Sequence, residues 1–287
     1  MRRKSNMYLQ TVIKDLLNHG DVKQTRGNYK DGTPASTISI TQHFEKYRVN
    51  AGQSVIHNYR NTAVKTAIQE MFWIYQDQTS NLPMARERGV NWWEEWEVDN
   101  SDTIGLAYGE TVKVYNLLDN LLKGMEEDPF SRRHILSLWQ QNHINFQLSC
   151  KGLVPCAYET LWTITENYEV DLTLIQRSSD FLMANPINKV QYHAFGLAVC
   201  GHLSAMTGKK HTLRNFAHFV QDLHIYDRHV DALKEIQGRI KKSENTYYRE
   251  QTLELPVCKN FYDYTVDDFV ITRIHSDKLE SPLEIVI

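Results

Sequence analysis

The chain has 287 residues, of which 41% are apolar and 23% charged, and its formal net charge at pH 7 is −3. This composition is typical of an ordinary globular protein, and it excludes a disordered or fibrous chain. It also argues against a general polyanion binder, because the overall charge would not attract a nucleic acid backbone. We expect a single domain over residues 1–287, long enough to bury a substantial core.

Nothing in the sequence indicates membrane insertion, secretion or a metal centre. The start, MRRKSNMYLQTVIKDLL, has a basic cluster without the apolar core of a signal peptide, and no stretch reaches the roughly 18 apolar residues of a membrane span. The cysteines match no zinc pattern or disulfide framework; they are Cys150, Cys156, Cys200 and Cys258. We therefore expect a cytoplasmic enzyme or binding protein, in the host cytoplasm if the source is a virus.

The first half of the chain is predicted to contain three helices and one long strand. Apolar side chains at spacings of three and four predict a helix over 5–18, which Gly20 is placed to end. The glycines and proline of 24–35 predict a loop, and the alternating, β-branched run at 36–49 predicts a strand. Helical spacing then returns at 62–75 and at 111–125.

The second half is predicted to contain most of the strands. Strand-like runs cover 134–140, 155–165, 168–176 and 213–224, and an apolar helix covers 188–206. Because the strands cluster and do not alternate regularly with helices, we expect an α+β fold with a mixed or antiparallel sheet.

Polar and ionisable residues concentrate in four short stretches, SRRH at 131–134, QRSSDF at 176–181, NPINK at 185–189 and QDLHIYDRH at 221–229. Arg132 and Arg133 could clamp an anion, but taken alone an adjacent pair is more often an ordinary surface feature. Arg177 beside Ser178 is a modest phosphate-type signal. Cys156, in LVPCAYETLW, is open to two interpretations, a buried small side chain or a nucleophile.

The order of these stretches resembles the thymidylate synthase family, including its pyrimidine nucleotide hydroxymethylase branch. Arg-Arg, Pro-Cys, Gln-Arg-Ser-x-Asp, Pro-x-Asn and Asp-x-His-x-Tyr follow one another at the family's separations, and IQEMFWIYQDQTS, NWWEEW, IGLAYG and DDFVITRI extend the likeness over nearly the whole chain. The resemblance implies a single catalytic domain of α+β fold, in which helices pack on a mixed sheet and a sheet face forms a homodimer interface.

The resemblance also implies folate-dependent one-carbon transfer to C5 of a pyrimidine nucleotide, expected to be dUMP, with 5,10-methylenetetrahydrofolate as co-substrate and no metal. Because C5 is a poor nucleophile, a thiolate must first add at C6 to form an enolate. The implied catalytic residues are the nucleophile Cys156, the proton relay Glu70, Tyr108 near the C5 proton and Asn188 at the base edge. An amide at 188 fits uracil, whereas the cytidylate branch carries aspartate. Nearby arginines are expected to lower the pKa of the thiol.

The other implied contacts hold the nucleotide and the folate. For the nucleotide they are Arg26, Arg132, Arg133, Arg177 and Ser178 at the phosphate, with His224 and Tyr226 at the 3′-hydroxyl; for the folate they are Trp93, Asp180 and Ile287. The resemblance places Arg132 and Arg133 in the partner subunit's site, so it implies an obligate homodimer. Neither a membrane nor a nucleic acid is expected as a partner.

Four segments depart from the family pattern, and one of them is QDLH at 221–224, where the family has Gly-Asp-x-His. Ala157 follows the nucleophile where the synthases have histidine, GNYKDGTPASTIS replaces a compact Thr-Gly loop, and Lys189, Val190 and Gln191 replace small residues behind the base. We interpret Ala157, together with YDRH at 226–229, as favouring a deoxyuridylate hydroxymethylase. The alternatives are a thymidylate synthase and, from another class, a nucleotide- or RNA-binding relative without catalysis.

Overall fold

The computed structural model describes residues 4–57, 59–243, 251–272, 276 and 278–286. Its α-helices are α1 (Lys4–His19), α2 (Val64–Tyr75), α3 (Leu82–Glu87), α4 (Gly109–Val114), α5 (Leu117–Glu127), α6 (Gln141–Ser149), α7 (Ala184–Thr207) and α8 (Val230–Ser243). Its strands are β1 (Asp21–Asn28), β2 (Pro34–Tyr47), β3 (Ile135–Ser137), β4 (Ala157–Ile164), β5 (Glu169–Gln176), β6 (Ser179–Asp180), β7 (Thr212–Tyr226), β8 (Thr252–Glu254) and β9 (Val270–Thr272).

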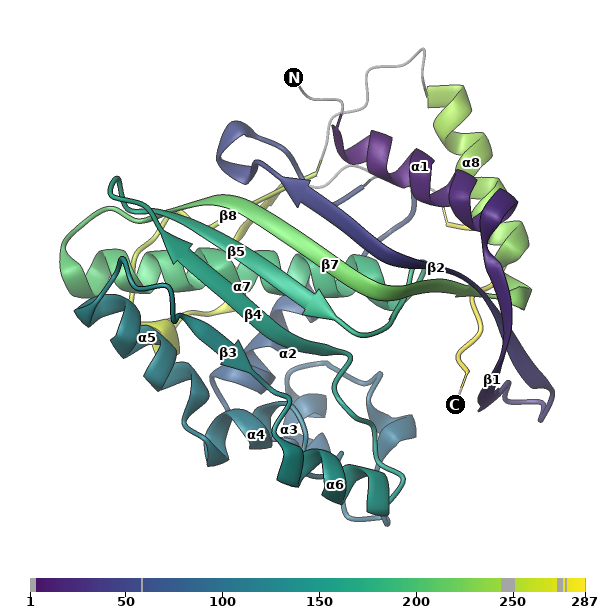
Figure 1. Cartoon of the computed structure of the whole chain (residues 1–287), viewed down its shortest axis with the longest axis horizontal. Helices are drawn as coiled ribbons and strands as arrows, with labels where there is room; N and C mark the ends of the chain where they lie inside the picture. The colour runs from purple at the N-terminus through teal and green to yellow at the C-terminus, as the bar shows by residue number, and fades with distance from the viewer. Residues whose placement is uncertain (1–3, 58, 244–250, 273–275, 277, 287) are drawn as a thin grey trace.

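One mixed sheet of seven strands dominates the molecule, in the order β1-β2-β7-β5-β4-β3, with the short β6 beside β7 (Figure 1). Neighbouring strands are antiparallel except where β7 meets β5 and β6, which it pairs in parallel. A parallel pair needs a crossover between its strands, and the 24-residue helix α7 lies within that connection. The predicted α+β fold with a mixed sheet is confirmed.

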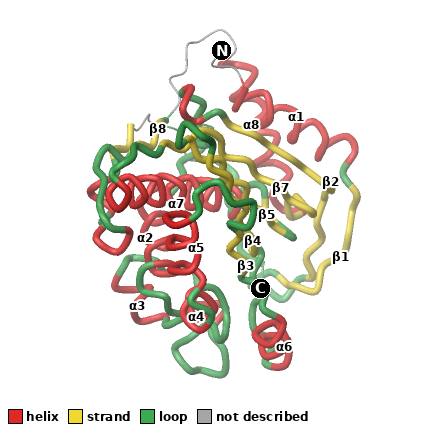
Figure 2. The backbone as a smooth tube through the Cα atoms, turned by 60° about the vertical axis from the view of Figure 1, so that its left-hand side comes forward, coloured by secondary structure: helices red, strands yellow, loops and turns green. Residues whose placement is uncertain are grey.

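Helices cover one face of this sheet. Figure 2 shows α2, α5 and α7 on the same side of the strands. At their centre Phe195 of α7 is fully buried, stacks on Tyr75 with 4.2 Å between ring centroids, and meets Trp162 of β4 edge to face. Burial of one such aromatic side chain contributes about 1.5–3 kcal/mol to folding. This packing anchors the middle of α7, two turns after the base-reading candidate Asn188.

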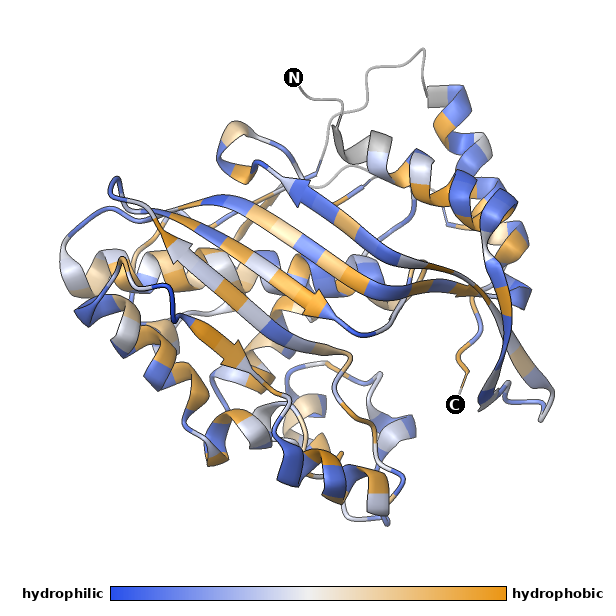
Figure 3. Cartoon of the chain, in the orientation of Figure 1, coloured by the Kyte–Doolittle hydropathy of each residue, from blue (hydrophilic) through white to orange (hydrophobic). Residues whose placement is uncertain are grey.

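The opposite face of β4, β5 and β7 is turned toward the viewer in Figure 1, and no described helix covers it. Apolar and polar residues largely alternate along these strands (Figure 3), which directs most apolar side chains to the helix-covered face, but some apolar residues also lie on the open face. Phe44 pairs with Phe219, which pairs with Ile175, and at the far edge Ile135 pairs with Leu161. Phe44 and Ile135 are 51% and 50% exposed. Within the described residues, this face therefore presents exposed apolar side chains, among polar ones, that no helix covers.

Several predicted elements differ from the structure. The predicted loop 24–35 is partly strand β1, which forms a hairpin with β2. The predicted helix 111–125 is two helices, because Asn116 has a left-handed backbone (φ 50°) that ends α4 and starts α5. The predicted strand 134–140 is shortened to β3, and α3, α6 and α8 were not predicted. None of the described helices is long and apolar enough to cross a membrane.

Candidate active site

Cys156 lies immediately before β4, at the point where β4 and β5 are joined by the pairing of Ala157 with Gln176. The backbone N–H of Cys156 donates to Tyr108 Oη at 3.1 Å, and Arg177 Nη2 donates to its Sγ at 3.3 Å. The backbone N–H of Arg177 also donates to the carbonyl oxygen of Cys156 at 3.0 Å. The sheet therefore holds the thiol, a phenol and a guanidinium together.

The guanidinium of Arg177 is fixed by the loop that carries the cysteine. Its Nε donates to the carbonyl of Pro155 at 3.0 Å and its Nη2 to that of Val154 at 2.8 Å. Burial raises the pKa of the Cys156 thiol, and the positive charge of Arg177 only partly offsets this increase. The expected lowering of the thiol pKa is therefore wrong for the chain without ligands, because desolvation outweighs the one guanidinium nearby.

Tyr108 has a strained backbone, with φ 46°, at the residue before α4. The next residue must be glycine, since a Cβ on Gly109 would lie 2.2 Å from the carbonyl oxygen of Thr79. This close approach packs α4 against the end of α2 and fixes the direction of the tyrosine ring. Burial, with the negative charge of a Cys156 thiolate, keeps the pKa of Tyr108 well above its usual value, so its hydroxyl stays protonated.

Glu70 and Trp93 form a buried pair beside Tyr108. Trp93 Nε1 donates to Glu70 Oε1 at 2.8 Å, and the Trp93 ring lies 5.2 Å from the Tyr108 ring. Glu70 Oε2 is buried and has no hydrogen-bond partner among the described residues. Burial raises the pKa of Glu70 to about 7, although the indole hydrogen bonds oppose the shift. A carboxyl group with this pKa can both give and take a proton near neutral pH.

Asn188 lies in the first turns of α7, at the centre of a row of buried or partly buried amides. Its Oδ1 accepts from Gln176 Nε2 at 3.1 Å, and its Nδ2 donates to Gln191 Oε1 at 3.2 Å. Gln176 in turn contacts Nε2 of the buried His218 through its own Oε1. These contacts leave Asn188 one N–H and one lone pair for a ligand.

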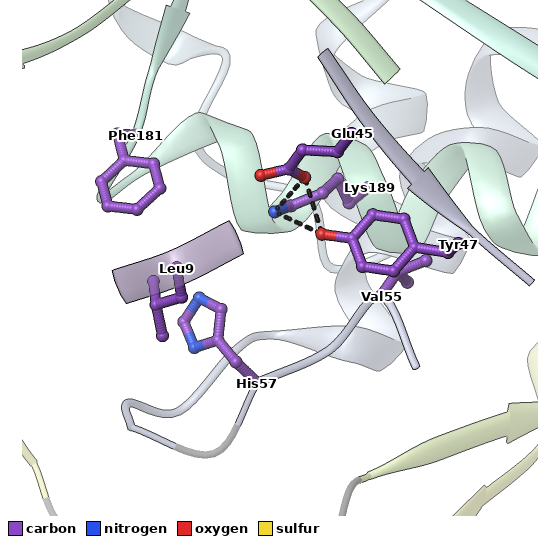
Figure 4. Close-up of a pocket in the computed structure, with 7 residues that line it drawn as sticks. All are labelled: Leu9, Glu45, Tyr47, Val55, His57, Phe181 and Lys189. Atoms are coloured by element: carbon purple, nitrogen blue, oxygen red, sulfur yellow. Dashed lines mark hydrogen bonds and ion pairs between the residues drawn. The ribbon is translucent and has the colours of Figure 1, made fainter. Parts of the chain in front are cut away.

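A buried ion pair lies directly behind Asn188. Lys189 Nζ is 3.0 Å from Glu45 Oε2 and 3.5 Å from Tyr47 Oη, and His43 Nε2 is 3.0 Å from Glu45 Oε1. Figure 4 shows Lys189 directed toward Glu45 and Tyr47, at a small cavity that His57 also lines. Burial would raise the pKa of Glu45, but Lys189 and the His43 hydrogen bond bring it well below its usual range. The expected repacking behind the base is therefore an ion pair.

The sugar candidates and the folate candidate Asp180 lie together where β6 meets β7. Asp180 pairs with His224 in the sheet, and its Oδ1 accepts the backbone N–H groups of Leu182 and Met183 at 2.8 and 3.0 Å. His224 Nδ1 is 3.0 Å from Asp222 Oδ1, and its ring contacts Tyr226. Burial raises the pKa of Tyr226, and the charges of Asp180 and Cys156 add to the shift, so this group lies near the thiol.

The three other arginine candidates make no hydrogen bond or ion pair with this cluster within the described residues. The Trp162 N–H donates to the His134 carbonyl at 2.9 Å, so Arg132 and Arg133 lie at the end of β4 remote from Cys156. Six residues of strand span about 20 Å. Both side chains are exposed, as is Arg26 on the edge strand β1, whose guanidinium makes no hydrogen bond or ion pair within the described part of the chain. Ser178 is partly buried next to Arg177, and Ile287 lies outside the described residues.

The family model described as thymidylate synthase matches residues 6–282. The chain belongs to the thymidylate synthase family. Thymidylate synthases of Streptococcus pyogenes serotype M5 (strain Manfredo) and of Lactococcus lactis subsp. lactis (strain IL1403) are each 35% identical to it, over 93% and 96% of both chains. The solved structure of thermostable thymidylate synthase A from Bacillus subtilis covers 99% of both chains at 30% identity, with a TM-score of 0.83.

The family resemblance seen in the sequence is confirmed. The thymidylate synthase family transfers one-carbon units with methylenetetrahydrofolate as co-substrate. Within the described residues, no cluster of three or more His, Cys, Asp or Glu side chains could hold a metal ion. Sequence reasoning missed Gln176 and His218 as supports of Asn188. Gln176 lies directly before Arg177 in QRSSDF, but only the strand pairing shows which way its amide points.

Proposed function

We propose that this chain transfers the one-carbon unit of methylenetetrahydrofolate to C5 of dUMP through a covalent adduct with Cys156, and that the product is dTMP. The observation that carries the proposal is the convergence of Cys156, Tyr108 and Arg177 on one strand end, with Glu70 and Asn188 nearby. The 35% identity to chains named thymidylate synthase supports methylation as the outcome.

Attack by the Cys156 sulfur on C6 forms a C–S bond and places negative charge on C5 and the base oxygen O4. Asn188 is fixed to donate its remaining N–H to O4 and to accept the base N3–H, so it would stabilise this charge as it develops. The positive charge of Arg177 favours the thiolate form of Cys156 over the thiol. The next residue, Ser178, would hold the 5′-phosphate. The high thiol pKa without ligands implies that nucleotide binding completes the activation.

After the one-carbon unit joins C5, the C5 proton must pass to water beside the Tyr108 hydroxyl, and the C–S bond must break with its electron pair returning to the sulfur of Cys156. Tyr108 accepts a hydrogen bond from the Cys156 backbone, so its hydroxyl lies beside the reacting carbons. Glu70, with a pKa of about 7, would relay a proton through water between O4 and the folate side. The unpartnered Oε2 of Glu70 is the oxygen available for that water.

Methylenetetrahydrofolate supplies the one-carbon unit and, for a methyl product, the hydride. Asp180 suits a pterin contact, because its Oδ1 accepts two backbone N–H groups while its Oδ2 makes no hydrogen bond within the described residues and lies 3.9 Å from His229 Nδ1. Trp93 is held by Glu70 and would line the folate side. Ile287, the other residue proposed for this contact, is not among the described residues.

We also propose that the active unit is a homodimer joined through the open face of the sheet. Its exposed apolar residues, Phe44 and Ile135 among them, need a partner surface. Arg132 and Arg133 lie too far from their own Cys156 to share its nucleotide, so in a dimer they would bind the partner subunit's phosphate. Arg26, His224 and Tyr226 would complete the phosphate and 3′-hydroxyl contacts within the same chain.

Incubation with dUMP and methylenetetrahydrofolate, with identification of both products, tests the proposed function. We expect dTMP and dihydrofolate. Hydroxymethyl-dUMP with tetrahydrofolate would instead support the hydroxymethylase, the second candidate, which rests on the buried Ala157 where the synthases carry histidine. Absence of either product from an enzyme that binds dUMP would contradict both and would favour a relative that only binds nucleotides.

A further inference from the structure

The amide row around Asn188 has a free donor at one end. Gln191 lies three residues after Asn188 on α7, so the two side chains share one helix face. Gln191 is 2% exposed, and its Oε1 accepts from Asn188 Nδ2 at 3.2 Å. Its Nε2, however, is buried without a hydrogen-bond partner among the described residues. An unpaired buried donor is costly, so a donor left free beside the base-reading amide indicates a ligand acceptor.

Contacts at the other end of the row, at His218, fix the orientation of each amide, so the Nε2–H of Gln191 cannot rotate to another direction. His218 is buried, and burial lowers its pKa to about 3, so the ring is neutral. It pairs with Glu45 across β2 and β7, which places it against the ion pair of Glu45 with Lys189. From His218 the contacts run through Gln176 to Asn188 and then to Gln191, each amide oxygen accepting and each nitrogen donating onward. A flip of one amide would break its contacts with both neighbours.

We propose that Gln191 belongs to the nucleotide site and that its free Nε2–H donates to O4 of uracil, beside the N–H of Asn188. This inference rests on the proposed function. A carbonyl oxygen has two lone pairs, so O4 can accept both donors. Cytosine presents an amino group there, which would face two N–H donors at once. Gln191 therefore selects uracil.

The test measures nucleotide affinity in the full-length protein for dUMP and for the 5′-phosphate of 2-pyrimidinone deoxyriboside, which lacks the 4-oxygen. We expect Gln191→Met to weaken dUMP binding about fivefold to tenfold, because it removes the O4 donor together with the oxygen that holds Asn188 Nδ2, and to change analogue binding less than twofold. Gln191→Leu should repeat the pattern, so that the result does not depend on one variant folding. The dUMP to dCMP affinity ratio should fall in both variants.

His193→Leu is the matched control, because His193 is a buried polar residue of α7 outside the amide row, and its Nδ1 has no hydrogen-bond partner in the part of the chain that the structure describes. It should affect dUMP and the analogue equally. Equal weakening of both ligands by Gln191→Met would overturn the O4 contact and leave the proposed function in place. Failure of the wild-type protein to bind dUMP would overturn the proposed function, and this inference with it.

Discussion

The indole N–H of Trp93 donates to Glu70 Oε1 at 2.8 Å, while the second oxygen of that buried carboxyl group has no partner among the described residues. Burial of the charge outweighs the hydrogen bonds that the indoles of Trp93 and Trp92 contribute, so the pKa of Glu70 is raised from 4.5 to about 7. The site therefore keeps a carboxyl group that is uncharged in part of the molecules at neutral pH.

The raised pKa of Glu70 predicts a pH-dependent stability difference. The unfolded chain ionises Glu70 at lower pH than the folded chain, so the contribution of this group is fully present below about pH 4.5 and is lost as pH rises toward 7. The shift corresponds to about 3 kcal/mol. Glu70→Gln should therefore gain stability relative to the wild type between pH 4.5 and 8, measured by urea unfolding. A difference in unfolding free energy between Glu70→Gln and the wild type that does not change with pH would contradict a buried, uncharged Glu70.

Arg177 is predicted to control the reactivity of the thiol. Its Nη2 lies 3.3 Å from Cys156 Sγ, and its charge lowers a pKa that burial raises. Arg177→Met should move the midpoint of Cys156 alkylation by iodoacetamide to higher pH, and Arg177→Lys should move it less because the positive charge remains. Peptide mass spectrometry separates Cys156 from the other cysteines. An unchanged midpoint in both variants would show that the guanidinium does not act on the sulfur.

Much of the fold could be predicted from periodicity, because long amphipathic helices such as α1 and α2 and long strands such as β2 and β7 carry a strong local pattern. The break at Asn116 could not, since it depends on one backbone angle inside an unbroken helical pattern. The same holds for the ion pair of Lys189 with Glu45, whose residues are far apart in the chain and meet only through packing.

The candidate site was predictable to the extent that it depends on residue type and order. Cys156, Glu70 and Asn188 were singled out by motif, and the fold then places each within a hydrogen-bonded cluster. The direction of the pKa shift of Cys156 was not predictable, because it depends on how completely the folded chain excludes water from the sulfur. The free donor of Gln191 could not be predicted either, because it depends on which side chains surround the amide in the folded chain.

If each active site of the dimer uses the arginines of the partner subunit, two inactive variants should restore activity when they are mixed. A Cys156→Ala chain retains its arginines, and an Arg132→Ala/Arg133→Ala chain retains its nucleophile, so a heterodimer of the two has one complete site. Mixing equal amounts should restore about a quarter of the wild-type activity once subunits have exchanged randomly. Exchange can be confirmed by native mass spectrometry. No recovery after confirmed exchange would show that the arginines act within their own chain or not at all.

Base choice is predicted to depend on the orientation of Asn188. Its amide oxygen is held by Gln176 and its nitrogen by Gln191, so it offers one donor and one acceptor that match uracil. The wild-type kcat/KM for dUMP should exceed that for dCMP by roughly 10⁴, since a mismatched base leaves buried polar groups unpaired. Asn188→Asp should shift the preference toward dCMP. Equal turnover of the two nucleotides by the wild type would mean that the site does not read the base.

The central claim is that Cys156 bonds covalently to C6 of the nucleotide while the one-carbon unit is attached to C5. Incubation with 5-fluoro-dUMP and methylenetetrahydrofolate tests it directly, because fluorine cannot leave as the C5 proton does and the adduct is trapped. Intact-mass measurement should show the protein with nucleotide and folate attached, peptide mapping should place them on Cys156, and the Cys156→Ser variant should stay unmodified. An unmodified wild-type protein that nevertheless binds 5-fluoro-dUMP would contradict the claim.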